Sequence, residues 1–309
     1  MATWVRFLFK KLIEIFCSLA VLATLSFLLL KLLPGGPFDE DFALNPLVRE
    51  TLSKNWGLHD SVFQQILKYM GSVFVGNLGV SMVRPDQSVV SIIGQGLANS
   101  MGLNLIALLC VLMGSFGIAI LSMRFRGSWF DRSVDQVMIA FLSLPSLFWG
   151  PLLIYLFGFY FNLLPVAFLT GPLNYILPVL TLSMRPLASL VRLLKTSLTE
   201  NYHFDYVRTA KAKGVGEWGI LIRHVLRNSM IPFLSYSGPL LVGLLSGSFL
   251  VEMLFAIPGL GGQFIMAVGD RDYTLIVGLS LFYGSLLIVM NSVIDVIMRM
   301  VDPRLREEA

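Results

Sequence analysis

Few residues of this chain have the types and spacing that catalysis or metal binding requires. The histidines, His59, His203 and His224, share no metal-ligand spacing, and Cys17 and Cys110 lie far apart inside apolar runs. No G-x-x-x-x-G-K-[ST] motif occurs, and the dipeptide Gly-Lys is absent, so the chain cannot cradle ATP phosphates in a P-loop. The sequence predicts that this chain is not an enzyme and has no catalytic residue, cofactor-binding residue or metal ligand.

Ionisable side chains that interrupt apolar runs are the remaining candidates for chemistry. Asp295 is followed four residues later by Arg299, which is the favourable order for a helical ion pair, and we expect a structural pair there. Arg185 stands near the middle of another apolar run and precedes Pro186. An arginine at the centre of a bilayer costs at least about 2.5 kcal/mol, so its side chain should face protein or water. The proline removes a backbone hydrogen bond and permits a bend that would turn the guanidinium inward.

A long basic segment, residues 195–229, lies between two apolar runs. Within it, residues 204–213 can form about three helical turns, and Gly214 is suited to cap the end of that helix. Small residues such as Thr209 and Ala210 would let another surface approach the helix closely. The alternative is an interfacial helix whose lysines and arginines meet anionic lipid.

The composition places these segments in a membrane protein. The chain has 309 residues, of which 56% are hydrophobic and only 14% are charged, about half the charged fraction of a soluble domain. This excludes an ordinary cytosolic enzyme, a disordered chain and a coiled coil. The net charge of +4 is attributed to lysines and arginines that flank membrane spans, rather than to nucleic-acid binding.

The fold class that follows is an all-α integral membrane protein with six transmembrane helices. A span needs about 20 mostly apolar residues, and the runs that qualify are roughly Leu12–Leu33, Leu97–Met123, Val137–Phe161, Tyr175–Leu194, Met230–Phe255 and Thr274–Met300. The first is expected to be an uncleaved anchor, and a small external segment (residues 34–95) follows it. We therefore divide the chain into residues 1–96 and a core of five spans, residues 97–309. Pro145 and Pro151 predict a kink in the third span.

The distribution of lysine and arginine sets the orientation. Most of them lie near the two termini, in the 124–132 turn or in the 195–229 loop, whereas residues 158–174 carry no charge. We therefore expect both termini and the 195–229 loop in the cytoplasm. Residues 34–95 and 158–174 are expected outside.

Several motifs, taken in order along the chain, resemble those of ABC-importer permeases. Residues 208–214 (RTAKAKG) fill the frame of that family's coupling loop, whose consensus is Glu-Ala-Ala, three residues, then Gly. Within that frame Arg replaces Glu and Thr replaces the first Ala. After it, residues 223–232 stand in place of the usual Ile-x-Leu-Pro. The altered frame and the missing Ile-x-Leu-Pro are both typical of the peptide-transport branch. Further motifs of that branch stand at Leu33–Pro37, Asn77–Ser81, Val251–Gly261, Arg271–Tyr273 and Asp302–Arg306. The resemblance runs nearly end to end and is closest to the first permease subunit of oligopeptide importers.

This resemblance implies a type I ABC-importer permease architecture in the bacterial inner (cytoplasmic) membrane. Such a subunit forms half of the translocation pathway of an ATP-driven peptide importer. Its partners are a homologous second permease, two cytoplasmic ATPase subunits that hold ATP and Mg, an extracytoplasmic peptide-binding protein, the peptide itself and membrane lipid. The residues that it assigns to the ATPase-coupling helix are Phe204, Asp205, Tyr206, Arg208, Thr209, Ala210, Lys211, Ala212 and Gly214.

Other candidate residues gain a meaning from the resemblance. A guanidinium fork matches a carboxylate, so Arg185 is a candidate for the translocation path; the alternative is a salt bridge to an acid on the partner permease. Gly243 and Gly247 put small residues on one helix face, for close packing either at the pore or permease–permease interface or within the subunit. Glu252, near the outer end of the fifth span, would help to seat the binding protein or orient the turn at residues 258–259.

Three other functions stay open on the sequence alone. A permease of the same family can carry dipeptides, nickel or another small solute. A stand-alone secondary transporter or channel would favour an inverted repeat or several buried charges, and the sequence has no convincing repeat and few intramembrane charges. A membrane-bound assembly scaffold would show no ATP-linked uptake.

Overall fold

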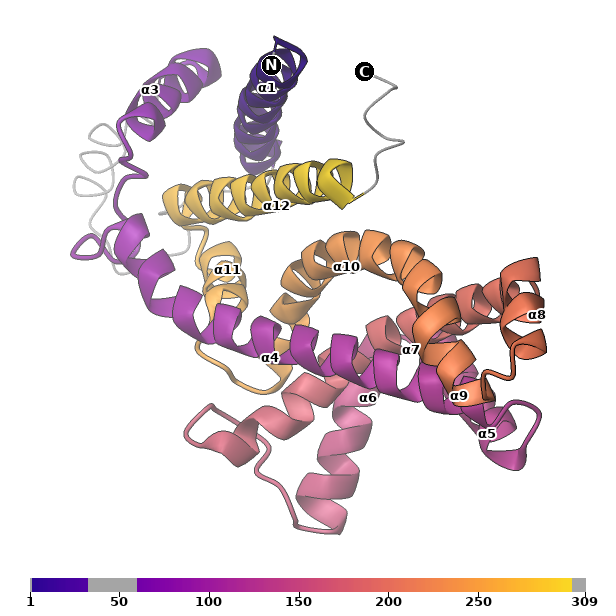
Figure 1. Cartoon of the computed structure of the whole chain (residues 1–309). Coiled ribbons are helices and arrows are strands. Elements are labelled where there is room, and N and C mark those ends of the chain that lie inside the picture. Colours follow the sequence, from indigo (N-terminus) through magenta and orange to yellow (C-terminus); the bar gives the residue numbers. More distant parts are fainter. Residues whose placement is uncertain (1, 33–59, 302–309) are drawn as a thin grey trace. The chain divides into compact units, whose positions relative to one another are not determined.

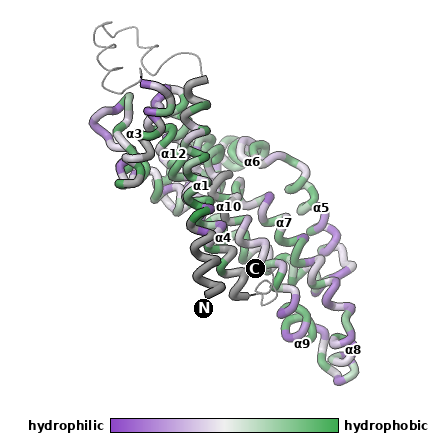
Figure 2. Tube along the Cα trace, turned by 90° about the horizontal axis from the view of Figure 1, so that it is seen from above, coloured by the Kyte–Doolittle hydropathy of each residue, from purple (hydrophilic) through white to green (hydrophobic). Residues whose placement is uncertain are grey.

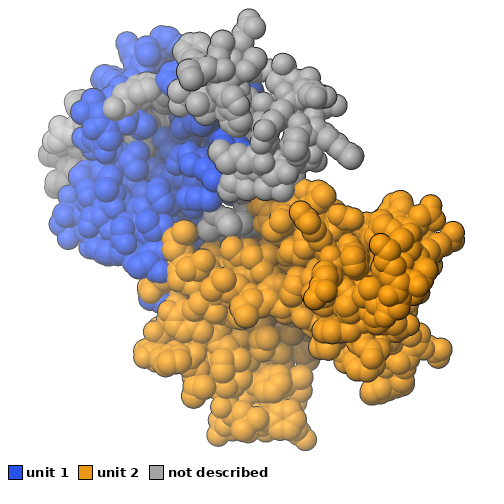
Figure 3. Space-filling view, viewed as in Figure 1, with its two compact units in different colours: residues 1–98, 258–309 blue, residues 99–257 orange. Residues whose placement is uncertain are grey.

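A computed structural model of the chain describes residues 2–32 and 60–301 (Figure 1). Across these residues the regular structure is helical, and the only bridge of β type is an isolated antiparallel one between Val80 and Ser88. The chain forms two compact units, which are coloured separately in Figure 3. Each unit is described by itself below.

The first unit joins the two ends of the sequence, residues 1–98 and 258–309. Its helices are α1 (Ala2–Leu32), α3 (Val62–Phe74), the first turns of α4 (Val89–Arg124), α11 (Leu260–Gly269) and α12 (Tyr273–Val301). Helix α1 packs against both α12 and α3. The sequence-based division into residues 1–96 and 97–309 did not anticipate this pairing of N-terminal and C-terminal helices, and it stays a prediction.

A buried carboxylate organises the first unit around the start of α12. Asp272 is 1% exposed and precedes the first residue of that helix. Its carboxylate accepts hydrogen bonds from the Ser81 hydroxyl, from the Met82 N–H at 3.1 Å and from the Leu275 N–H at 3.0 Å. The bond to Leu275 is an N-cap, which satisfies one of the free N–H groups in the first turn of α12. Two motifs that are far apart in the sequence therefore form one structure.

The second unit consists of residues 99–257 and contains the rest of α4. Its other elements are α5 (Trp129–Ser143), α6 (Ser146–Leu153), a π-helical turn (Ile154–Tyr160), a 3-10 turn (Pro172–Tyr175), α7 (Ile176–Tyr202), α8 (Asp205–Ala212), α9 (Glu217–Ile220), a second π-helical turn (Leu221–Val225) and α10 (Leu226–Leu254).

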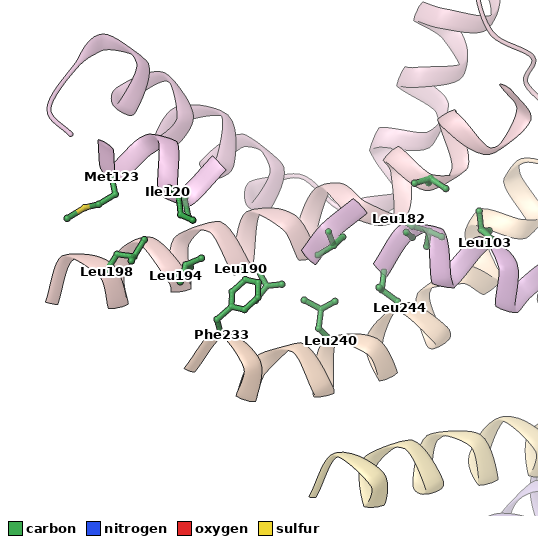
Figure 4. Packing of buried hydrophobic residues seen from close by; sticks show 14 of the residues in the cluster. Leu103, Ile120, Met123, Leu182, Leu190, Leu194, Leu198, Phe233, Leu240 and Leu244 are labelled. Carbon is green, nitrogen blue, oxygen red and sulfur yellow. The ribbon is translucent and has the colours of Figure 1, made fainter. Parts of the chain in front are cut away.

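The core of the second unit lies along α7. Leu190, Leu194 and Leu198 repeat every four residues, which places them on one helix face, and all three are fully buried. Figure 4 shows this stripe between α4, which contributes Ile120, and α10, which contributes Phe233. Lipid tails are as apolar as leucine, so close packing rather than escape from water holds such helices together. Helix α7 is therefore fixed on two sides by its neighbours.

The membrane spans can be compared with these helices. Three described helical segments are long and apolar enough to cross a membrane: Val89–Arg124, Pro172–Tyr202 and Tyr273–Val293. They coincide with the predicted second, fourth and sixth spans. The predicted third span is a pair, Trp129–Ser143 and Leu147–Tyr160, bent by 111°. The break at Pro145 explains the bend, because proline disfavours a helical conformation in the residue before it, and the predicted kink is confirmed. All but the last residue of the predicted fifth span lies in α10, and the described part of the predicted first span lies in α1. The total of six spans stays a prediction.

Candidate coupling helix and Arg185 cavity

Helix α8 is the short helix of the basic loop that follows α7. Asp205 lies in its first turn and Lys211 in its last, and charges of these signs stabilise the two ends of a helix dipole. The helix has eight residues, so it is shorter than the three turns predicted for residues 204–213. Figure 2 shows hydrophilic residues gathered around α8 and α9.

Gly214 ends α8, as the sequence predicted. Its φ of +77° is a left-handed conformation that glycine adopts without steric cost. The Gly214 N–H donates to the Lys211 carbonyl at 2.9 Å, and the Val215 N–H donates to the Ala210 carbonyl at 3.1 Å. These are the two bonds of a Schellman motif. Val215 also packs against the core that contains Ala210, so the turn is held against its own unit.

The residues of α8 divide into an inner and an outer face. Val207 and Ala210 are 1% and 6% exposed and belong to the core of the second unit. The outer face consists of exposed residues at positions i, i+3, i+4 and i+7: Asp205, Arg208, Thr209 and Ala212. Ala210 follows Val207 by three residues and shares its face, so it packs within its own chain instead of receiving another surface. Thr209 and Ala212 remain as the small residues that a partner can approach.

Aromatic and polar contacts order the start of α8 and fasten the helix to the end of α7. The rings of Phe204 and Tyr206 stack with their centroids 5.9 Å apart and their planes 18° from parallel. The Tyr206 hydroxyl donates a hydrogen bond to Asn201 Oδ1 at 3.2 Å. The Lys211 ammonium lies 4.6 Å from the centroid of the Tyr202 ring, within the range of a cation–π interaction. A displacement of α8 would therefore also displace the end of α7.

Four residues that the sequence analysis missed tie α7 to α5, and we call them the Lys195 network: Ser122, Asp131, Asp135 and Lys195. Lys195 Nζ lies 2.5 Å from Asp131 Oδ1 and 2.6 Å from Asp135 Oδ1. Asp131 also accepts hydrogen bonds from the Ser122 hydroxyl at 2.5 Å and from the Gly127 N–H at 2.9 Å. The side chains of Lys195 and Asp131 are only 17% and 10% exposed. Two aspartates one turn apart on a helix are visible in the sequence, but no local pattern indicates a partner some 60 residues away.

Arg185 lies on an exposed part of α7, beside a cavity of about 180 Å³. Side chains of three helices line this cavity, including Leu147 of α6, Thr181 of α7 and Leu254 of α10. Helix α7 continues through Pro186, which also lines the cavity. Arg185 is the only charged residue among the described residues of the lining. The structure therefore places it at an opening rather than in the packed core.

Comparison with known proteins assigns the chain to a family. The family model described as binding-protein-dependent transport system inner membrane component matches residues 111–307. The dipeptide transport system permease protein DppB of Bacillus subtilis is 32% identical over 301 residues, which cover 97% of this chain and 98% of that protein. The oligopeptide transport system permease proteins OppB of Haemophilus influenzae and Escherichia coli K12 are each 31% identical, over 97% of this chain and 99% of those proteins. The chain belongs to this family.

Solved structures share the fold of the permease. An amino acid ABC transporter crystallised with histidines gives a TM-score of 0.55 at 16% identity, covering 68% of this chain and 94% of that chain. The inward-facing MetNI methionine ABC transporter gives 0.56 at 16% identity, covering 68% and 96%. The permease therefore has the helical fold of ABC-transporter membrane subunits. This agrees with the architecture expected from its sequence.

The glycine face of α10 is partly open in the permease. Gly243 is exposed, and apart from its chain neighbours and the backbone of its own helix, no described atom lies within 4 Å of the position that a Cβ would take there. This favours a face that meets the pore or a partner over one that packs within the subunit. The side chains of Asp295 and Arg299, and the position Gly247, lie outside the part that the structure describes in this detail. The expectations for these three residues stay predictions.

Glu252 of the permease is fully buried, near the end of α10. That end is also a Schellman motif, in which the Ile257 N–H donates to the Glu252 carbonyl at 2.8 Å. Ala256 occupies the left-handed position, with φ +49°, and the Phe168 N–H donates to the Phe255 carbonyl at 3.0 Å. The burial of Glu252 favours the role of orienting the following turn over contact with a binding protein. Its assignment to gating stays a prediction.

Proposed function

We propose that this permease is the first permease subunit of an ATP-driven peptide importer in the bacterial inner membrane. It forms half of the translocation pathway, and a homologous second permease forms the other half. The relatives that are 31% to 34% identical over nearly the whole chain are dipeptide and oligopeptide permeases by name, which supports peptides as the substrate. ATP and Mg belong to two partner ATPase subunits, because this chain has no phosphate-binding loop.

The observation that carries the proposal is the exposed outer face of α8. A partner that binds Arg208, Thr209 and Ala212 would hold a helix whose opposite face is buried in the unit's own core. Closure of the ATPase dimer on ATP would displace α8 and, through its contacts, the end of α7. The Lys195 network would carry this displacement to α5. In physical terms, ATP binding biases a helical bundle that has two arrangements.

Reconstitution of the complete complex tests the proposal. The permease is purified with its partner permease and both ATPase subunits, placed in proteoliposomes, and given the binding protein and labelled peptides of two to eight residues. We expect uptake that needs both ATP and the binding protein and that has a preferred peptide length. Uptake of nickel in place of peptide, or peptide uptake that is independent of ATP, would contradict the proposal.

The orientation is tested by labelling single cysteines with a membrane-impermeant thiol reagent. In a background lacking Cys17 and Cys110, cysteines at Ser88 and Thr170 should react from the outside of intact cells or spheroplasts. A cysteine at Ala212 should react only after the membrane is opened. All three positions are exposed, so their reactivity reports the side of the membrane rather than burial. The reverse pattern would contradict cytoplasmic termini.

A further inference from the structure

Arg185 lies at the mid-depth of its membrane span. The span predicted from Tyr175 places Arg185 ten residues along α7, which is about 15 Å at 1.5 Å per residue. The hydrocarbon core of a bilayer is about 30 Å thick, so Arg185 is close to the midplane. Its guanidinium stays charged in proteins, and exposure to lipid there costs at least about 2.5 kcal/mol. Arg185 must therefore meet water or a negative charge.

No described acid forms an ion pair with Arg185. Three acids of the second unit are engaged elsewhere: Asp131 and Asp135 bind Lys195, and Asp205 pairs with Arg208. No ion pair or hydrogen bond joins the Arg185 guanidinium to any described side chain. Its counter-charge must come from a bound substrate, from a partner subunit or from residues outside those described.

The cavity beside Arg185 has room for a small group. Its volume of about 180 Å³ corresponds to about six water molecules, which suits a carboxylate and the atoms next to it. The Thr181 hydroxyl donates to the Leu177 carbonyl at 2.8 Å, so its proton is not available to a bound group. Apart from Arg185, the other residues of the lining are apolar. Gly243 leaves further open space on the α10 side. The cavity thus offers one fixed positive charge within apolar walls.

We propose that Arg185 contacts the C-terminal carboxylate of the peptide as the peptide passes the middle of the membrane. This inference rests on the proposed function in peptide import. The free carboxylate is a feature that linear peptides share whatever their sequence, and the planar guanidinium binds it with two parallel hydrogen bonds. Apolar walls around a single charge would accept varied side chains while still orienting the chain end. The competing arrangement is a fixed salt bridge from Arg185 to an acid on the partner permease.

The test compares a labelled tripeptide with a free C-terminus and the same tripeptide with an amidated C-terminus, in the reconstituted complex. Each variant is compared with wild type separately for each peptide, which removes any selectivity of the binding protein from the comparison. We expect Arg185→Gln to lower uptake of the free acid about tenfold, the effect of one lost charged contact of about 1.4 kcal/mol, and to change uptake of the amide less than twofold. Arg185→Lys keeps the charge and should lose less.

Arg192 provides the matched control. It lies seven residues further along α7 and is also exposed, so Arg192→Gln removes an arginine from the same side of the helix and should leave both peptides unaffected. Gly243→Val is a second probe, since it fills open space beside Arg185 without removing the charge, and it should lower uptake of the free acid.

The outcomes separate this inference from the proposed function. If wild-type complex imports no peptide, the proposed function fails and the role of Arg185 fails with it. If wild type imports both peptides and Arg185→Gln lowers both equally in an intact complex, the carboxylate contact is refuted while the importer stands. Loss of the partner permease from purified Arg185→Gln complex would assign Arg185 to the subunit interface and likewise refute the contact.

Discussion

Replacing Gly214 tests whether the turn after α8 couples ATP hydrolysis to transport. Gly214 has φ +77°, and a residue with a Cβ costs about 1–2 kcal/mol in this conformation. Beyond the two adjacent residues, no described atom lies within 4 Å of the Cβ position, so collision with the rest of the structure adds nothing and the cost is conformational. A change of this size shifts the equilibrium between the capped and an uncapped turn by about 5- to 30-fold. The outer face of α8 would then spend much of the time in an orientation that the ATPase subunit does not bind.

The expected loss of coupling depends on how well the residue that replaces Gly214 tolerates a positive φ. Gly214→Val should be the most harmful because a β-branched side chain is least compatible with positive φ, and Gly214→Asn the least because asparagine visits this region. Gly216 is the matched control, since its φ is −63° and its Cβ position is also open. The assay is the number of ATP molecules hydrolysed per peptide imported, measured on variants present at wild-type levels in the membrane. The reasoning is refuted if Gly214→Val couples as well as Gly216→Ala.

Two further predictions concern the elements that hold α8. Lys195→Met leaves the Asp131 carboxylate without its cation in a site that is 10% exposed. We expect a loss of about 3–5 kcal/mol, seen as a lower thermal unfolding midpoint of the detergent-solubilised complex, whereas Lys213→Met, at an exposed position, should have little effect. Equal midpoints of the two variants would contradict the network. Ala210→Asp buries an unpaired charge in the core and should lower that unfolding midpoint. Ala212→Asp, on the exposed face, should leave the midpoint unchanged and weaken ATPase binding in a pull-down. Equal stability of the two variants would contradict the assignment of faces.

Local signals in the sequence predicted the features that depend on a few neighbouring residues. Glycine after a run of helix-forming residues indicated the end of α8 at Gly214, because few other residues tolerate a left-handed turn. Pro145 indicated the break in the third span for a similar reason, since the effect of a proline on the residue before it needs no distant partner. The apolar runs that correspond to α4, α7 and α12 were long enough to be recognised by length alone.

Features that depend on distant residues escaped the sequence analysis. Packing against the core decides which face of α8 is buried. The sequence alone therefore could not show that Ala210 is buried and Ala212 exposed. The bond between Lys195 and Asp131 joins residues 64 positions apart. Similarly, motifs at Ser81 and Asp272 were recognised separately, while their contact across 191 positions required the fold. The cavity beside Arg185 is formed by three helices and has no signature in any one of them.

The discontinuity of the first unit has a consequence for biosynthesis. Residues 99–257 form a unit of continuous sequence, so its helices can pack as soon as they have been made. The first unit needs Asp272 for the hydrogen bonds of Ser81 and Met82, and Asp272 is synthesised long after them. At a translation rate of about 5–20 residues per second, Ser81 waits roughly 10–40 s for its partner. During that interval the N-terminal helices must persist without the contacts that later fix them, so the two sequence-distant parts of the first unit are joined last.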